Sequence, residues 1–265
     1  ELGPAGGHLI FAEGTGTTPK YSTTTAAGDS WTPPGSALTT GGSGRINWQI
    51  ARACPTIRNQ KIVGILIDDQ GSEPAGDLYL HLWNGETGAW SDIWPGRVNT
   101  TLSSLYADQR GFDLAYEQNT GRAILVWWDN VSGEVRYRIW SSTANAWVGP
   151  AEIIDVDPDV TTTNIRWVRL DARTGTDEIM LVTEDANSDL YAIRWTGTAW
   201  SNGLQLTQNA YTITYQCYDL GWELTRGNCL ILWGEGTSTR YAMWSTSATV
   251  WVIVGDPGPN IAATT

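Results

Sequence analysis

The stretches Tyr137-Arg138-Ile139-Trp140 and Tyr241-Ala242-Met243-Trp244 follow one pattern. Each is succeeded, seven positions after its tryptophan, by another tryptophan, Trp147 or Trp251. Three weaker copies keep the same order of aromatic residues along the chain. They are Leu80 to Trp83 with Trp90, Trp195 with Trp200, and a degraded copy with Tyr21, Thr24 and Trp31. Self-similarity of this kind predicts a repeat architecture.

Two alternating types of unit emerge when the chain is aligned on these tryptophans. Type A contains Gly111–Glu117 and recurs at Cys217–Glu223, whereas type B contains Arg45–Trp48 and recurs at Asn164–Trp167. The order is A, B, A, B, A, with the first A cut short. Each unit reads as four short strands separated by turn residues such as Asn84-Gly85. Four short strands repeated about every 50 residues are typical of propeller blades.

We therefore expect an all-β, five-bladed β-propeller of four-stranded blades, folded as one domain. The expected blades cover residues 1–41 together with 260–265, 42–104, 105–160, 161–210 and 211–259.

The first blade is expected to contain both ends of the chain. Glu1-Leu2 align with Glu223-Leu224, which places them after the end of the first strand of a type A unit. Because open sheet edges are sticky, we expect Ile261–Thr265 to return as the missing innermost strand of this blade and to close the ring. The alternative is that the tail, or a segment lost before Glu1, pairs with another subunit and builds a fibre.

The repeated tryptophans have an expected role as large flat fillers between blades. These structural positions are Trp31, Trp83, Trp90, Trp140, Trp147, Trp195, Trp200, Trp244 and Trp251. Two other tryptophans, Trp94 and Trp128, have no counterparts in the other copies. Core positions should recur and ligand positions need not, so Trp94 and Trp128 are candidates for stacking against a ligand; ordinary packing is the alternative.

The composition narrows the functional class. Sixteen Trp and ten Tyr stand against two Phe, and the formal net charge is −12. An acidic chain without a basic cluster is a poor match for nucleic acid, and no apolar stretch is long enough to cross a membrane. Abundant Thr, Ser and Gly with only two Lys, Lys20 and Lys61, favour an extracellular or cell-surface protein. Because the sequence begins at Glu1 rather than at Met, we expect either that a leader has been removed or that the chain is a fragment of something longer.

Carboxylates on the first strands of the units are the residues that a glycosidase would use. They are Asp113, Glu117, Asp171, Asp219 and Glu223. Two catalytic carboxylates need unlike environments, but Asp113 with Glu117 recurs as Asp219 with Glu223. That recurrence favours capping or strand-bridging hydrogen bonds over catalysis, so no catalytic residue is assigned.

The sequence gives little support for a catalytic nucleophile or for a reactive or metal-binding thiol. His8 and His81 lie in different units, and no Gly-x-Ser-x-Gly motif is present. The three cysteines, Cys54, Cys217 and Cys229, lack a metal-ligand spacing. One disulfide is possible among them, without a preferred pair.

Calcium is the one cofactor for which the sequence offers a candidate site. Asp185, Asn187 and Asp189 place oxygen-bearing side chains at alternate positions, as a hard cation requires. The same residue types are common in hairpin turns for backbone reasons alone, so a plain turn is the alternative. No other cofactor is expected.

The segments Arg136–Trp140 with Ala146-Trp147, Phe112–Gln118 and Ile165–Leu170 together resemble repeats of bacterial secreted or surface proteins with alternating Trp-rich units. More distantly, the architecture is similar to that of propeller lectins, which hold sugars between blades. The resemblance implies a non-enzymatic surface module, adhesive or structural, as part of an extracellular filament or on its surface. Its partners would be other copies of itself, a filament protein or glycans. The alternatives are a carbohydrate-binding propeller and, third, a glycoside hydrolase.

Overall fold

The computed structural model describes residues 2–3, 6–11, 18–24, 29–36, 45–57, 60–68, 75–94, 98–103, 109–156, 164–211 and 215–254. Throughout these residues the chain is all-β, and they contain no helix that could cross a membrane. The strands form antiparallel sheets, four of them four-stranded. The expectation of an all-β chain with four-stranded sheets is confirmed.

The sheets follow one another along the sequence, and we number them 1 to 5. Sheet 1 contains β1 (Leu2–Gly3), β2 (Gly6–Phe11), β3 (Lys20–Thr23) and β4 (Gly35–Ser36). Sheet 2 contains β5 (Arg45–Ala53), β6 (Gln60–Asp68), β7 (Ala75–Asn84), β8 (Ala89–Asp92) and β9 (Asn99–Ser103), the last paired with β7. Sheet 3 contains β10 (Phe112–Tyr116), β11 (Arg122–Asp129), β12 (Glu134–Ser141) and β13 (Ala146–Ile154). Sheet 4 contains β14 (Ile165–Ala172), β15 (Ile179–Asp185), β16 (Leu190–Trp195) and β17 (Trp200–Thr207), and sheet 5 contains β18 (Tyr218–Trp222), β19 (Cys229–Glu235), β20 (Ser238–Ser245) and β21 (Val250–Val254).

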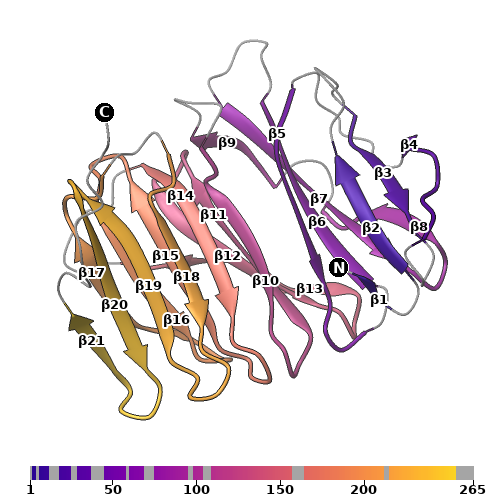
Figure 1. Cartoon of the computed structure of the whole chain (residues 1–265). Helices are drawn as coiled ribbons and strands as arrows, with labels where there is room; N and C mark the ends of the chain where they lie inside the picture. The colour runs from indigo at the N-terminus through magenta and orange to yellow at the C-terminus, as the bar shows by residue number, and fades with distance from the viewer. Residues whose placement is uncertain are drawn as a thin grey trace.

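The sheets stand side by side in chain order like the segments of a fan (Figure 1). The first strands of sheets 2 to 5 lie innermost, where β10 contacts both β5 and β14, and β14 contacts β18. Arg110, just before β10, forms a parallel bridge with Trp167 of β14. The first strands converge so closely that the rings of Trp48 in β5 and Trp167 in β14 meet edge to face, 6.0 Å between centroids.

The tryptophan pairs occupy matching positions on the two outer strands of their sheets. Trp83 with Trp90, Trp140 with Trp147, Trp195 with Trp200 and Trp244 with Trp251 are direct cross-strand neighbours. Their ring centroids are 5.2, 5.3, 5.4 and 5.4 Å apart, within the range for favourable aromatic pairs. In sheet 1 the same place is taken by a bridge between Thr24 and Trp31.

Apolar side chains between successive sheets form the core, as a stack of amphipathic sheets requires. One cluster joins sheets 2 and 3 through Leu80, Phe112 and Leu125; another joins sheets 3 and 4 through Val126 and Tyr191. A third cluster joins sheets 4 and 5 around residues such as Met180 and Ile231. Each sheet is therefore stabilised by its neighbours.

Sheet 1 differs from the sequence alignment at its innermost strand. We expected the chain to begin after the end of this strand, yet Leu2 and Gly3 form a short strand paired with Gly7 and Gly6. The hairpin is tighter than in sheet 5, where Trp222 pairs with Cys229, and this brings Leu2 and Gly3 into register. The tail 260–265, expected to close the ring at this place, lies outside the described residues.

Candidate functional site

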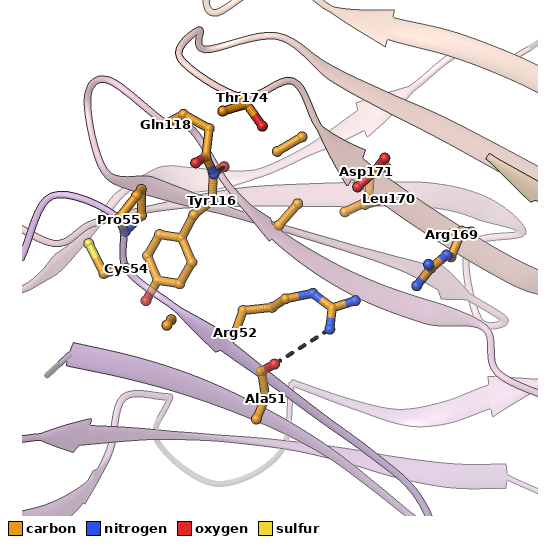
Figure 2. Close-up of a pocket in the computed structure, with 13 residues that line it drawn as sticks. Ala51, Arg52, Cys54, Pro55, Tyr116, Gln118, Arg169, Leu170, Asp171 and Thr174 are labelled. Atoms are coloured by element: carbon orange, nitrogen blue, oxygen red, sulfur yellow. Dashed lines mark hydrogen bonds between the residues drawn. The ribbon is translucent and has the colours of Figure 1, made fainter. Parts of the chain in front are cut away.

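A cavity of about 470 Å³ lies at the carboxyl ends of three innermost strands, β5, β10 and β14 (Figure 2). Neighbouring innermost strands run in the same direction, so their ends meet on one side of the fan. The polar groups in the wall are Arg52 from β5, Gln118 after β10, Arg169 and Asp171 from β14, and Thr174. The aromatic part of the wall is Tyr116.

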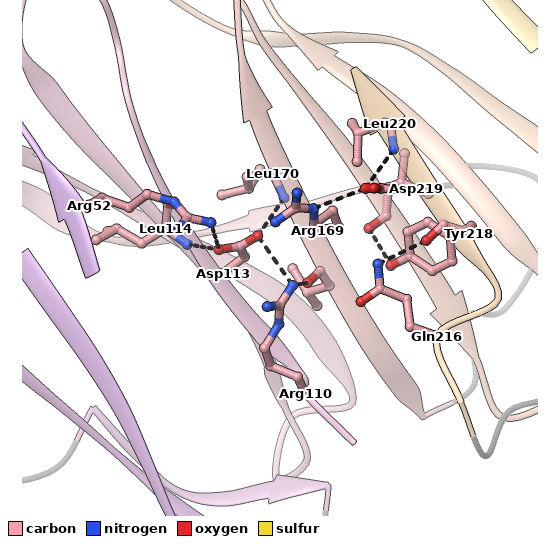
Figure 3. A network of polar contacts seen from close by, with 12 residues as sticks. Arg52, Arg110, Asp113, Leu114, Arg169, Leu170, Gln216, Tyr218, Asp219 and Leu220 are labelled. Atoms are coloured by element: carbon pink, nitrogen blue, oxygen red, sulfur yellow. Dashed lines mark hydrogen bonds and ion pairs between the residues drawn. The ribbon is translucent and has the colours of Figure 1, made fainter. Parts of the chain in front are cut away.

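Arg52 is held by sheet 3, the neighbour of its own sheet. Its Nε donates to the carbonyl oxygen of Leu114 at 3.0 Å, and its Nη2 lies 3.3 Å from Oδ1 of Asp113 (Figure 3). Two bonds to a neighbouring sheet fix the plane of the guanidinium. Its remaining N–H groups stay on the cavity side, where Nη1 donates only a long bond of 3.4 Å to the carbonyl of Ala51.

Asp113 is the centre of this network and is fully buried. It accepts hydrogen bonds from the backbone N–H groups of Leu114 and Leu170, both at 2.8 Å, and pairs with Arg52 and Arg110 (Figure 3). These partners come from β5, β10 and β14, so one carboxylate ties three sheets together. A buried charge persists when it is paired and hydrogen-bonded in this way. The strand-bridging role that we favoured for Asp113 describes this geometry.

Glu117, at the other end of β10, also ties sheets together. Its carboxylate accepts from Nε and Nη2 of Arg122 at 2.6 and 2.7 Å, and from the indole Nε1 of Trp195 in sheet 4 at 2.6 Å. The hydroxyl of Thr120 donates to it as well. Asp113 and Glu117 thus have their oxygens occupied by structural partners.

Asp171 is the carboxylate in the cavity wall, and the backbone N–H groups of Trp222 and Ala172 hydrogen-bond to it. Burial raises its pKa above the ordinary value, while the positive charge of Arg169 opposes that rise. Arg169 lies between two acids, since its Nε is 3.4 Å from Oδ1 of Asp219 on β18. The cavity therefore presents a carboxyl group and guanidinium groups close together, a set that both donates and accepts hydrogen bonds.

The thiol and phenol near the cavity are held in place by packing. Cys54 donates to the carbonyl of Gly121 at 3.7 Å, where the neighbouring turn approaches closely. A Cβ on Gly121 would lie 1.9 Å from Oγ1 of Thr56, and its φ of +68° also favours glycine. Burial raises the pKa of Tyr116 well above its usual range, so its hydroxyl stays neutral. All three cysteines are free thiols.

The two candidate stacking tryptophans lie in the packing between strands. Trp128 is 3% exposed and belongs to the cluster between sheets 3 and 4. Trp94 is half-buried, with edge contacts to Trp127 and Trp147, and the guanidinium carbon of Arg138 stands 4.6 Å from its ring centroid. A buried ring or one covered by a cation offers little surface for stacking, and the structure does not bring these two residues together with the cavity.

Asp185, Asn187 and Asp189 form the hairpin between β15 and β16. Oδ1 of Asp185 accepts the backbone N–H groups of Asn187 and Asp189 at 2.8 and 2.9 Å, and Ser188 has a positive φ of 68°. These are the features of a side-chain-capped turn. The described part of the chain contains no cluster of three or more His, Cys, Asp or Glu arranged to hold a metal.

Arg52, Gln118 and Thr174 were not expected from the sequence as site residues, whereas Asp171 was among the candidate carboxylates. Their shared signal is position, because each stands at or just beyond the carboxyl end of an innermost strand. That signal becomes visible only when the three strands are known to converge.

No protein-family model matches the sequence, and comparison with curated protein sequences gives no significant match. Solved structures do resemble it. A six-bladed β-propeller lectin from Aleuria aurantia, described as recognising fucose, matches with a TM-score of 0.55 at 11% identity, over 97% of this chain and 76% of the lectin. The Dos1 propeller matches with a TM-score of 0.55 at 10% identity, over 91% and 55%. A Dyadobacter fermentans protein of unknown function matches with a TM-score of 0.51 at 11% identity, over 94% and 76%. At such identities the likeness shows a β-propeller fold.

Proposed function

We propose that this chain is a carbohydrate-binding β-propeller module and that the cavity between β5, β10 and β14 holds the sugar. The observation that carries the proposal is the composition of its wall, which sets Arg52, Asp171, Gln118 and Thr174 around about 470 Å³. Ligand pockets span about 300–1,000 Å³ and use a few fixed polar groups. Sugar hydroxyls both donate and accept, so a wall with guanidinium, carboxylate, amide and hydroxyl groups suits them.

Binding without turnover is part of this proposal. Asp113, Glu117 and Asp171 all accept structural hydrogen bonds, so none of these three is a free acid of the kind that glycoside hydrolysis uses in pairs. We also propose the extracellular or cell-surface location that the composition led us to expect, because glycans are abundant there. The lectin neighbours that carry fucosides make fucose the first sugar to test.

The test is a glycan array with the intact chain, followed by titration calorimetry of the best sugar. Asp171→Asn is expected to weaken binding about tenfold or more, because a hydrogen bond to a charged group contributes roughly 1.5–3 kcal/mol. Gln118→Ala is expected to weaken it about two- to tenfold, because a hydrogen bond between neutral groups contributes roughly 0.5–1.5 kcal/mol. The matched control, Gln208→Ala, changes an exposed amide far along the chain and should leave affinity unchanged. A folded chain that binds no saccharide at millimolar concentration contradicts the proposal. Mass spectrometry that finds the bound glycan cleaved contradicts the non-enzymatic part.

A further inference from the structure

Three of the five sheets are built from type A units, and within the described residues only the middle one is covered on both sides. For each sheet we call the face toward the next sheet in chain order the leading face, and the opposite one the trailing face. Sheet 3 packs its trailing face on sheet 2 and its leading face on sheet 4, both of type B. Sheets 1 and 5 stand at opposite sides of the fan (Figure 1).

The leading face of sheet 5 exposes apolar side chains that sheet 3 buries. Leu230 and Leu232 of β19 are 41% and 40% exposed. Their counterparts in β11 are Ile124 and Val126, both 0% exposed beneath sheet 4. The same positions of the same unit type are therefore apolar in both sheets, but only one of them has a partner within the described residues.

The carboxylates of that face show the same contrast. In sheet 3, Asp113 accepts the backbone N–H of Leu170 and Glu117 accepts the indole N–H of Trp195, and both donors belong to sheet 4. The equivalent side chains in sheet 5 are Asp219 and Glu223, which are 71% and 44% exposed. Asp219 still accepts the N–H of its own neighbour, Leu220, at 2.9 Å, just as Asp113 accepts that of Leu114. Asp219 therefore keeps the hydrogen bond from its own strand. The donors that sheet 4 provides to Asp113 and Glu117 have no equivalent for Asp219 and Glu223 within the described residues.

The trailing face of sheet 1 is uncovered in a complementary way. Leu9 is 52% exposed, whereas Ile231, at the matching position of β19, is 0% exposed against sheet 4. Trp31 is 50% exposed, whereas Trp251 at the matching position donates its indole N–H to the carbonyl of Asn202 in sheet 4 at 2.8 Å. In both comparisons a type B sheet provides the cover that sheet 1 lacks.

Sheet 1 is a poor partner for the leading face of sheet 5. The indole that reaches Glu117 belongs to Trp195, which pairs across strands with Trp200. In sheet 1 the residue in that place is Thr24, paired with Trp31, and its hydroxyl already donates to the carbonyl of Ser30 at 2.6 Å. A second copy of the chain offers the same sheet 1. Sheets 2 to 5 all have a tryptophan at this position, and of these only the type B sheets 2 and 4 follow a type A sheet in the described chain.

We infer that the leading face of sheet 5 and the trailing face of sheet 1 receive one further type B sheet from additional polypeptide. This sheet completes an alternation of six blades, A, B, A, B, A, B, instead of the five-bladed ring expected from the sequence. It supplies a backbone N–H to Asp219, an indole N–H to Glu223, and apolar cover to Leu230, Leu232 and Leu9. The six-bladed count agrees with the lectin fold, of which this chain covers 76%.

The test extends the full chain after Thr265 by a second copy of its own type B unit, residues 161–210. The matched control carries a second copy of the type A unit, residues 105–160. Hydrogen exchange of the β19 amides, measured by mass spectrometry, should slow at least tenfold in the type B extension and stay unchanged in the type A extension. Glu223→Gln should reduce that protection in the extended chain but have no effect in the original one.

Several results overturn the inference. Equal protection by both extensions would show that the face has no preference for type B, and no protection by either would show that it accepts no sheet. If β19 in the original chain already exchanges as slowly as β11, the face is occupied by sheet 1 or by a second copy. Sedimentation of the original chain then separates these two cases, since the first gives a monomer and the second a dimer.

Discussion

Asp113 and Asp219 show how far a residue's neighbours determine its role. The two residues occupy the same position of a type A unit, and each accepts the backbone N–H of the residue that follows it. Asp113 is buried among partners from three strands, whereas the side chain of Asp219 is 71% exposed. The recurrence of the acid in the sequence indicated a structural role, and the hydrogen bonds of Asp113 agree with it. Only the structure shows that Asp113 has partners from neighbouring sheets on both sides, whereas Asp219 is exposed toward the end of the fan.

Glu184 is a second buried acid and gives a prediction about pH. Burial raises its pKa to about 8, and the thiol of Cys217, 3.6 Å from Oε1, only partly opposes this rise. The folded chain therefore keeps the proton between about pH 4.5 and 8, where an unfolded chain would release it. Stability must fall as pH rises through this window, because the folded state binds more protons than the unfolded state.

We expect the free energy of unfolding to decline between pH 5 and 8 by up to about 4 kcal/mol through this one group. In Glu184→Gln most of that slope should vanish, and the variant should be more stable than the parent at pH 8. Urea unfolding at several pH values measures how the free energy of unfolding changes with pH. The control is Glu86→Gln, which changes an acid in an exposed turn. A slope that is unchanged in Glu184→Gln would contradict the prediction.

At the scale of strands and sheets, the tryptophan pairs connect sequence to packing. Tyr137 of sheet 3 lies with its ring 5.8 and 5.7 Å from those of Trp195 and Trp200 in sheet 4, and Tyr21 of sheet 1 lies 5.9 and 5.8 Å from Trp83 and Trp90 in sheet 2. In sheets 1 and 3 the tyrosine of the type A unit thus packs on the tryptophan pair of the following type B unit. These two pairs join two strands within a sheet and also contact the preceding sheet in the fan.

Trp140→Ala should therefore cost about 3–5 kcal/mol of folding stability, because this ring is 3% exposed and pairs with Trp147. Trp31→Ala, at the equivalent of the second position in sheet 1, should cost about 1 kcal/mol or less, since half of its surface is already in water. Chemical unfolding of both variants makes the comparison. Equal losses would show that the degraded copy in sheet 1 packs as tightly as the others.

The strand pattern was readable from the sequence because alternating apolar residues and paired tryptophans are local signals. Even the degraded copy, Thr24 with Trp31, forms the expected bridge. The innermost strand of sheet 1 was missed because the register of a hairpin depends on the length of its turn. The cavity was missed because it depends on how the sheets fan, and the residues that line it are separated by more than a hundred positions, from Ala51 to Thr174.

For the whole molecule, stability is distributed unevenly along the fan. A stack of similar units is stabilised by its nearest neighbours, so units covered on both faces should open last. Sheet 3 has buried residues on both faces, whereas sheets 1 and 5 have one exposed face each. The end sheets are therefore the weakest parts of the described chain.

Native-state hydrogen exchange should reveal this order. We expect the amides of β11 and β12 to exchange slowest, and those of β2, β3, β19 and β20 to exchange at least tenfold faster. The comparison uses the unmodified chain at neutral pH, so it requires no substitution. Uniform protection from sheet 1 to sheet 5 would contradict the prediction and would indicate that the end faces are covered in solution.

The four cross-strand tryptophan pairs also give the molecule an optical property of its own. Two indoles held 5.2–5.4 Å apart at a fixed tilt couple their electronic transitions, and the interplanar angles here run from 56° to 75°. Such coupling produces paired bands of opposite sign in circular dichroism, superimposed on the usual β-sheet spectrum. Because the coupling disappears when two strands separate by a few ångströms, these bands follow the strand pairing itself, without any introduced label.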